Sequence, residues 1–259
     1  MGAYSLRAAW GYRDLLRHLV LRDLRHKYKG SSLGFVWSLL HPLLMAAVYT
    51  LAFRYIAPNK IEHFTVFLLS GLLPWMFFSA ALSGAAGSIV DNSPLVRKVA
   101  FPRLILPLSA VASQFVQFVL MYAVIVALSA MFSVGASLSL IALIPLIALQ
   151  VLFTAGLALT LSTAYVFARD TRHLLDIGLQ VWFWITPVVY SAALVPAALG
   201  RVLRWNPMAY FISGYHDIIV SHTLPTLMAF IALTLVAGAT ATFGWLVFAR
   251  FQRRFAELI

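Results

Sequence analysis

Long apolar runs separated by short basic segments constrain the fold of this chain of 259 residues more than any other feature. Apolar residues account for 62% of the sequence and charged residues for 10%, whereas soluble domains average about 45–50% and about 25%. This composition excludes a soluble enzyme, and it excludes intrinsic disorder because so apolar a chain does not stay solvated. We therefore expect an all-α integral membrane protein that forms one domain over residues 1–259.

Six apolar runs match the roughly 20 residues that a helix needs to cross the hydrocarbon core of a bilayer. The predicted spans are residues 33–56, 64–90, 104–132, 138–168, 174–190 and 224–249. Residues 191–222 are too apolar for an ordinary loop and too often interrupted by Pro and Gly for a full crossing. Short re-entrant or interfacial helices are expected there, because backbone polar groups must be paired within lipid.

Small and polar residues inside the spans indicate contacts between helices. Ser79, Ser83 and Gly87 recur at every fourth position of the second span, which favours close helix packing in lipid. Two polar pairs, Gln114 with Gln117 and Gln150 with Thr154, have two interpretations: they line a polar path, or they form hydrogen bonds between helices.

The first 32 residues carry seven basic side chains and lack a continuous apolar core, which argues against a secretory signal peptide. Tyr12, Leu16, Leu19 and Val20 share one helical face, so residues 1–32 are predicted to form an amphipathic helix at the membrane interface.

Basic residues gather in four segments, which are residues 1–32, 91–103, 169–173 and 250–259. Of the 19 Lys and Arg residues, those outside these segments are Arg54, Lys60, Arg201 and Arg204. The positive-inside rule then places the four segments, and both termini, in the cytoplasm. This arrangement accounts for most of the net charge of +11 without a nucleic-acid partner.

The usual catalytic and nucleotide-binding motifs are missing from the sequence. No Gly-Lys pair occurs, so a P-loop is excluded, and neither an H-E-x-x-H nor a G-x-S-x-G motif is present. Cys is absent, which excludes disulfides, a thiol nucleophile and thiolate metal ligands. We expect the chain not to be an enzyme and to hold no cofactor or metal.

Short motifs follow one another in a fixed order along nearly the whole chain. They are RDLRHKYK (22–29), SLGFVWSLLHPL (32–43), GLLPW (71–75), VAFPR (99–103), LPLS (106–109), RD (169–170), TP (186–187) with Tyr190, and NP (206–207). Together they resemble the ABC-2 type permeases of polysaccharide exporters, which carry lipid-linked O-antigen, teichoic acid or capsule. One departure is Leu104, where many members of that family have an acidic residue.

The resemblance implies a half-transporter in the bacterial inner membrane. Two copies of the chain would form one pore, and two copies of a separate ATPase subunit, which bind ATP and Mg, would drive it. Residues 91–103 would contain a short coupling helix that docks on the ATPase. Leu95, Val96 and Val99 would form its apolar ridge, with Arg97 and Lys98 facing acidic groups. Residues 191–222 would form an outer gate that includes Arg201, Arg204, Asn206 and Pro207.

Aromatic residues make up 14% of the chain and are candidates for a pore lining. Sugar rings rest well on aromatic faces, and such contacts do not impose one hydrogen-bond pattern on a sliding polymer. The candidates are Trp37, Tyr49, Phe53, Trp75, Phe78, Trp182, Phe183 and Trp184. The alternative is that they belong to the interfacial aromatic belt common to membrane proteins.

The leading hypothesis is therefore the membrane subunit of an ATP-driven exporter of undecaprenyl-linked polysaccharide, with lipopolysaccharide O-antigen favoured by the first-span motif. The alternatives are a capsule or teichoic acid exporter, an ABC-2 exporter of small molecules, and an intramembrane enzyme that modifies lipid-linked sugars.

Overall fold

The computed structural model describes residues 11–28, 30, 36–55, 61, 63–99, 101–131, 138–191 and 195–259. The start of the predicted interfacial helix (1–10), the start of the first predicted span (33–35) and part of the predicted gate (192–194) lie outside these residues. The described residues are helical and contain no strand, as expected. The longer helices are α2 (Arg13–Tyr28), α3 (Val36–Tyr55), α4 (Phe64–Gly87), α6 (Ile105–Met131), α7 (Leu143–Phe167), α8 (Thr171–Ile185), α10 (Pro207–Ile219) and α11 (Leu227–Phe251).

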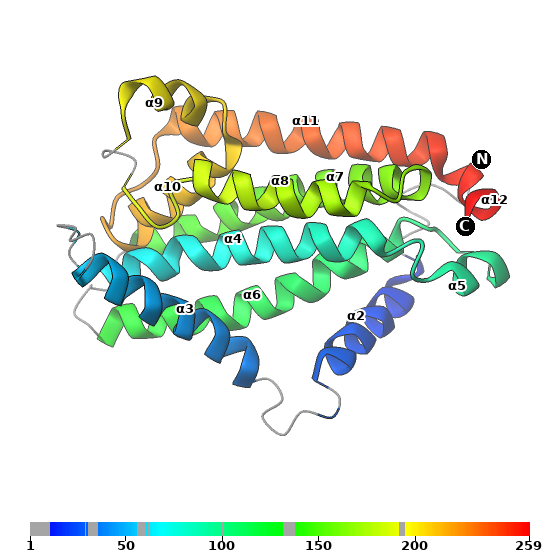
Figure 1. Ribbon diagram of the computed structural model, residues 1–259, viewed down its shortest axis with the longest axis horizontal. Helices are drawn as coiled ribbons and strands as arrows, with labels where there is room; N and C mark the ends of the chain where they lie inside the picture. Colours follow the sequence, from blue (N-terminus) through cyan, green and yellow to red (C-terminus); the bar gives the residue numbers. More distant parts are fainter. Residues whose placement is uncertain are drawn as a thin grey trace.

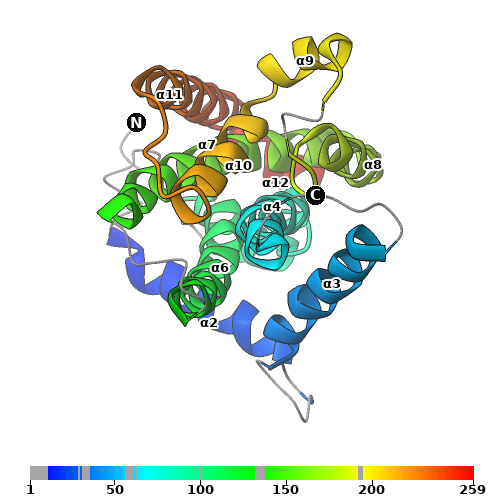
Figure 2. The same cartoon turned by 90° about the vertical axis from the view of Figure 1, so that its left-hand side faces the viewer.

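Helix α4 lies at the centre of the bundle, where it contacts α3, α6, α7, α8 and α10 (Figures 1 and 2). Its sequence is apolar on every side, which is typical of a helix surrounded by other helices. Pro74 inside α4 has no N–H, so the carbonyl of Ser70 loses its helical partner. Tyr122 Oη of α6 donates a hydrogen bond to Ser70 O at 3.4 Å and takes the place of that partner.

A second set of hydrogen bonds joins α4 to α7 and α10. Gln150 Nε2 donates to Pro74 O at 2.9 Å, and Tyr215 Oη donates to Gln150 Oε1 at 2.6 Å. Both Gln150 and Tyr215 are fully buried. Because a buried amide is costly unless it is hydrogen-bonded, these contacts fix the positions of three helices relative to one another. Of the two readings of Gln150, the structure shows the interhelical hydrogen bond.

The most extensive contact between two described helices joins α7 and α11. The two backbones touch at glycines: a Cβ added to Gly156 would lie 2.5 Å from the carbonyl of Thr240, and one added to Gly244 would collide with Gly156 O. On α4, a Cβ added to Gly84 would make an ordinary contact of 3.8 Å with Ala110, and a Cβ at Gly71 or Gly87 would meet a side chain, that of His216 or Asp91. The contact between two backbones therefore lies at a helix pair that the repeat of small residues in the second predicted span did not indicate.

Among the described residues, four helical segments are long and apolar enough to cross a membrane. They are Phe64–Gly87, Ile105–Val126, Ser139–Phe167 and Leu227–Arg254, which correspond to the second, third, fourth and sixth predicted spans. Within α3, which corresponds to the first predicted span, Leu40–Phe53 is a shorter apolar segment.

Helix α8 differs from the fifth predicted span, 174–190. It begins three residues earlier, at Thr171, and ends at Ile185. Proline restricts the preceding residue to an extended conformation, and Thr186, before Pro187, accordingly has ψ 132°. With 15 residues, and a rise of about 1.5 Å per residue, α8 is about 22 Å long, which is less than the hydrocarbon core of about 30 Å.

Two helices, α9 (Ala197–Arg204) with 8 residues and α10 with 13, occupy the region predicted to hold short helices between the last two spans. Helix α10 is buried between α4 and α7, whereas α9 projects from one end of the bundle (Figure 2). We call this end the α9 end.

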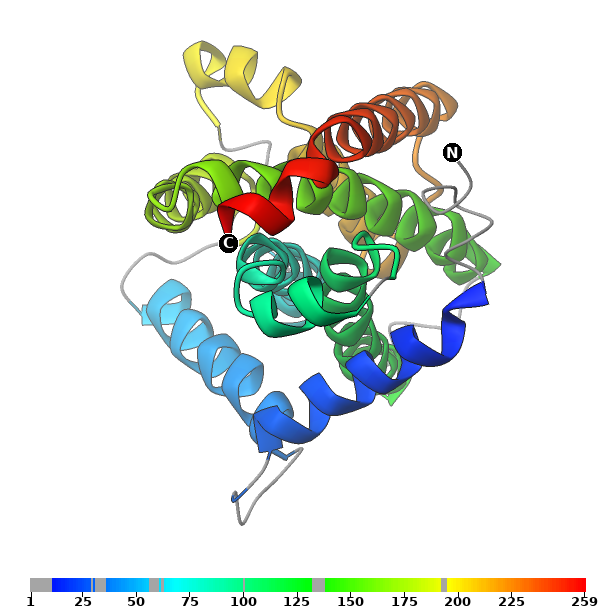
Figure 3. The same cartoon turned by 90° about the vertical axis from the view of Figure 1, so that its right-hand side faces the viewer.

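The opposite end, which we call the terminal end, carries α5 (Ser93–Lys98), α12 (Phe255–Leu258) and the C-terminus (Figures 1 and 3). A separate hydrophobic cluster fills it, and α2, α5, α6, α7, α11 and α12 all contribute residues. Leu104 is buried in this cluster. An unpaired acidic side chain would be unfavourable in that environment.

Candidate functional site

The predicted coupling segment forms the short helix α5 at the terminal end. Val96 is buried and Leu95 is partly buried, and both pack on the terminal cluster. Arg97, Lys98 and Val99 are exposed. Val99 follows the last helical turn in an extended conformation (φ −124°, ψ 132°), so its side chain leaves the face that Leu95 and Val96 share. Of the three residues of the predicted ridge, Leu95 and Val96 therefore pack on the terminal cluster, and Val99 is exposed.

Hydrogen bonds hold the start of α5 to α4 and α2. Asn92 Nδ2 donates to Ser88 O at 2.8 Å, and Arg22 Nη1 of α2 donates to Asn92 Oδ1 at 2.9 Å. Arg22 also forms a salt bridge with Asp23 at 2.9 Å. These contacts with α4 and α2 fix the position of α5. The exposed side chains of Arg97 and Lys98 therefore extend from a helix that is held in place.

The apolar face of α2 packs on the protein. Leu19 is buried and Leu16 partly buried in the terminal cluster, and the helix runs against α6. Tyr12, on the same predicted face, is exposed. The amphipathic pattern is confirmed as a helix over Arg13–Tyr28, while its location at the membrane interface stays a prediction.

Asn206 connects the elements of the predicted outer gate. Its Oδ1 accepts hydrogen bonds from Met208 N at 3.0 Å, as the N-cap of α10, and from Trp182 Nε1 of α8 at 2.7 Å. Its Nδ2 donates to Thr186 Oγ1 at 2.9 Å. Pro207 takes the first helical position, where its missing N–H costs nothing. Asn206 therefore links the end of α8 to the start of α10.

The two other predicted gate residues, Arg201 and Arg204, are exposed on α9. Tyr210 Oη donates a hydrogen bond to the carbonyl of Arg204 at 3.1 Å, which connects the end of α9 to α10.

We expect the Asn206→Ala variant to lose about 2–4 kcal/mol of stability. The loss of an N-cap costs about 1 kcal/mol, and the partly buried indole N–H of Trp182, left without its acceptor, costs about 1–3 kcal/mol more. Thermal unfolding of the purified chain in detergent measures the change. Thr226→Ala is the matched control, since Thr226 caps α11 through Ala229 N at 3.3 Å but is exposed and has no second helix to hold. Equal destabilisation by the two substitutions would contradict a linking role for Asn206.

The eight aromatic candidates fall into three groups by exposure: buried, exposed and partly exposed. Trp75 and Phe78 are buried inside the chain, where their ring centroids lie 6.4 and 5.2 Å from that of Trp182. In this conformation they stabilise the core of the subunit and have no surface to offer a polymer. Trp37 is 50% exposed and Trp184 is 57% exposed. The remaining four, all partly exposed, are Tyr49, Phe53, Trp182 and Phe183.

Titratable residues in the described part of the chain do not gather into a candidate metal centre, because no group of three or more His, Cys, Asp or Glu is close enough to hold an ion. Asp176 of α8 accepts a hydrogen bond of 3.4 Å from Ser83 of α4. The arrangement is that of a helical scaffold with polar contacts between helices.

The chain matches known membrane transport proteins over most of its length. The model of the ABC-2 type transporter family matches residues 14–220. An O-antigen export system permease protein, RfbA, of Klebsiella pneumoniae is 33% identical over 95% of both chains. Its namesake from Myxococcus xanthus is 33% identical over 98% of both. The polysialic acid transport protein KpsM of Escherichia coli is 22% identical over 75% of this chain and 76% of its own length.

Proposed function

Because the chain belongs to the ABC-2 type transporter family, we propose that it is the membrane-spanning subunit of an ATP-binding-cassette exporter of lipid-linked polysaccharide, with O-antigen as the cargo. The observation that carries this proposal is the identity of 33% with O-antigen export permeases over 95–98% of the chain. Capsule export is the second candidate, because the polysialic acid transport protein matches a smaller part of the chain at 22% identity.

The proposed topology has six spans, with both termini in the cytoplasm. The four long apolar helical segments would supply the second, third, fourth and sixth spans, and α3 and α8 would supply the first and the fifth. The terminal end would face the cytoplasm, since it carries the exposed Arg97 and Lys98 of α5 and the basic C-terminal segment. The α9 end would then face outward as the gate.

The proposed assembly contains two copies of this chain and two copies of an ATPase subunit. A symmetric pair is the simplest closed arrangement that places a pore between two identical subunits. Because the sequence has no P-loop, ATP and Mg would bind to the ATPase subunit. Helix α5 would receive the ATPase through Arg97, Lys98 and Val99, which are the exposed members of the predicted coupling set.

The proposed pore lining consists of the aromatic candidates that keep exposed surface. Trp37 of α3 and Trp184 of α8 have the most, and Tyr49, Phe53 and Phe183 have less. Trp182 also belongs to this group, but its hydrogen bond to Asn206 gives it a second role in the fold.

A reconstituted system tests the proposed function. We expect proteoliposomes that contain this chain and its ATPase to move lipid-linked O-antigen across the bilayer only when ATP is supplied. The chain by itself should hydrolyse no ATP, because it has no P-loop. Protection of the polymer from an externally added glycosidase measures transport, and phosphate release measures hydrolysis. Hydrolysis by the isolated chain, or transport of capsular polymer but not of O-antigen, would contradict the proposal.

A further inference from the structure

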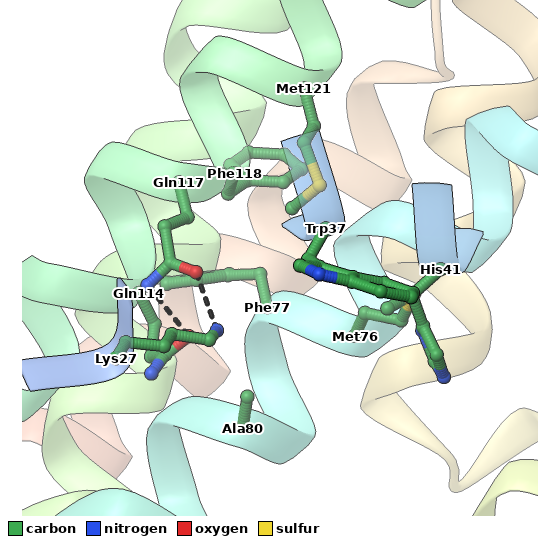
Figure 4. Close-up of a pocket in the computed structure, with 10 residues that line it drawn as sticks. All are labelled: Lys27, Trp37, His41, Met76, Phe77, Ala80, Gln114, Gln117, Phe118 and Met121. Atoms are coloured by element: carbon green, nitrogen blue, oxygen red, sulfur yellow. Dashed lines mark hydrogen bonds between the residues drawn. The ribbon is translucent and has the colours of Figure 1, made fainter. Parts of the chain in front are cut away.

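A cavity of about 280 Å³ lies between the end of α2 and the start of α3, with residues of α4 and α6 forming its wall (Figure 4). The last turn of α2 is basic and contains Arg25, His26 and Lys27, whereas α3 is an apolar helix. The cavity therefore lies between a charged segment and an apolar one. Its wall residues Met76, Phe77 and Ala80 of α4 and Gln114, Gln117 and Phe118 of α6 belong to the middle turns of these two helices.

Lys27 gives the cavity a positive charge that no acidic residue balances. None of the residues that line the cavity is acidic, and the salt bridge found among the described residues joins Arg22 to Asp23 instead. Partial burial lowers the pKa of Lys27, because desolvation disfavours the charged form. An anion bound beside the ammonium group would counteract this effect.

A pair of glutamines on α6 positions Lys27. Lys27 Nζ donates a hydrogen bond to Gln117 Oε1 at 2.6 Å, and Gln117 Nε2 donates to Ser113 O at 3.3 Å and to Gln114 Oε1 at 3.4 Å. Gln117 is buried in a helix that is otherwise apolar enough to cross a membrane. The amide is neutral, so it holds the ammonium group without neutralising it.

Trp37 and His41 of α3 lie across the cavity from Lys27, one helical turn apart (Figure 4). The indole of Trp37 is half exposed, and its face provides the apolar surface on which a sugar ring can rest. The side chains of His41 and Gln114 add hydrogen-bonding groups of the kind that sugar hydroxyls require. A cation, an aromatic face and neutral polar groups thus meet in one cavity.

We propose that this cavity binds the phosphate and first sugar of the lipid-linked polysaccharide, with Lys27 at the phosphate and Trp37 against the sugar. The inference rests on the proposed function and adds to it a site of substrate capture. This site takes Trp37 out of the proposed pore lining and is separate from the aromatic residues around Trp182. The lipid chain would remain in the bilayer beside α3 while the head group occupies the cavity.

The absence of Cys from the chain allows a direct test of occupancy. Ala80 lines the cavity, so an Ala80→Cys variant of the full chain carries a single thiol there. In phosphatidylcholine nanodiscs, undecaprenyl diphosphate carrying one N-acetylglucosamine should slow maleimide labelling of this thiol at least fivefold. Undecaprenyl diphosphate without sugar should slow it less. Phosphatidylglycerol at the same density, or a soluble nucleotide sugar, should leave the rate within twofold.

Substitutions in the Ala80→Cys background distinguish the contact of Lys27 with the phosphate from the contact of Trp37 with the sugar. Lys27→Gln should abolish protection by both polyprenyl ligands, Lys27→Arg should retain it, and Trp37→Leu should remove only the increment due to the sugar. Arg25→Gln is the matched control, since it removes a charge from the same turn of α2 without lining the cavity. Gel filtration of each variant verifies that it is folded.

Three results would overturn the inference. Full protection of the Lys27→Gln variant would show that the charge is not used, and protection by phosphatidylglycerol would assign the cavity to bulk lipid. Protection by the nucleotide sugar would assign it to a soluble ligand. If protection fails while the unchanged chain and its ATPase still export O-antigen, the proposed function stands without this site. A lack of export by the unchanged complex counts against the function instead.

Discussion

The Gly156→Leu variant is expected to reach the membrane in folded form at a small fraction of the level of the unchanged chain. Gly156 of α7 faces the backbone of Thr240 of α11, and any Cβ there would lie 2.5 Å from a carbonyl. The side chain cannot avoid this by rotating, since the atom in conflict is the Cβ itself. The helices must separate along the most extensive helix contact described in the chain. Overpacking typically costs about 1–3 kcal/mol of stability, and we expect Gly156→Leu to cost about 3 kcal/mol or more.

Gly238→Ala on α11 is the control for this prediction. A Cβ at Gly238 would meet nothing within 4 Å, so the substitution should be neutral or should stabilise the helix by about 0.5–1 kcal/mol. Fluorescence-detected gel filtration after a temperature ramp measures both variants. If Gly156→Leu melts at the temperature of the unchanged chain, then α7 and α11 are not held in backbone contact.

The glycine contact shows which part of the fold the sequence could predict. The apolar runs predicted the positions of most helices to within a few residues, because a helix is favoured by local hydrogen bonds and by the length of the run. The contact between Gly156 and Gly244 depends on two residues 88 positions apart. Further small residues surround both glycines, among them Thr160 and Thr240, but a run of small residues does not say which helix it will meet. The repeat around Ser83 drew attention to α4 instead.

Helix ends were predictable only where a residue type dictates them. Pro187 explains why α8 ends at Ile185, and its effect on Thr186 could have been inferred from the sequence, but the prediction extended the span to residue 190 because the apolar run continued. Val188 and Val189, beyond that end, are buried without being helical. Apolar composition reports burial, and burial alone does not distinguish a helix from a buried turn.

The candidate site was predictable to a smaller extent. Asn206 was recognised as a motif residue, but its role as a link between α8 and α10 depends on Trp182, which is 24 positions away. The contact of Lys27 with Gln117 spans 90 positions, and no local pattern indicates it. Exposure of a side chain is likewise decided by tertiary packing, which is why Phe78 was a candidate for the pore and is found in the core.

The second large effect is expected from reversing the charges on α5. In the double variant Arg97→Glu, Lys98→Glu, co-purification of the ATPase should fall by about tenfold or more. Both side chains are exposed on a helix whose other side is anchored by Val96, so the change alters the outward surface and leaves the terminal cluster intact. If acidic groups of the ATPase face α5, like charges would meet, which costs several kcal/mol, and about 1.4 kcal/mol already corresponds to tenfold in affinity.

Arg201→Glu, Arg204→Glu is the matched control, because it makes the same change of charge on exposed residues of α9 at the opposite end of the bundle. Its ATPase recovery should equal that of the unchanged chain. Membrane insertion of the α5 variant should also be retained, since the basic residues of 1–32, 169–173 and 250–259 still favour the same orientation.

Full ATPase recovery and full export by the α5 variant would show that Arg97 and Lys98 act only on topology. The contact with the ATPase would then have to involve another part of the terminal end, of which the exposed face of α2 is the nearest, because Arg22 joins α2 to Asn92 at the start of α5.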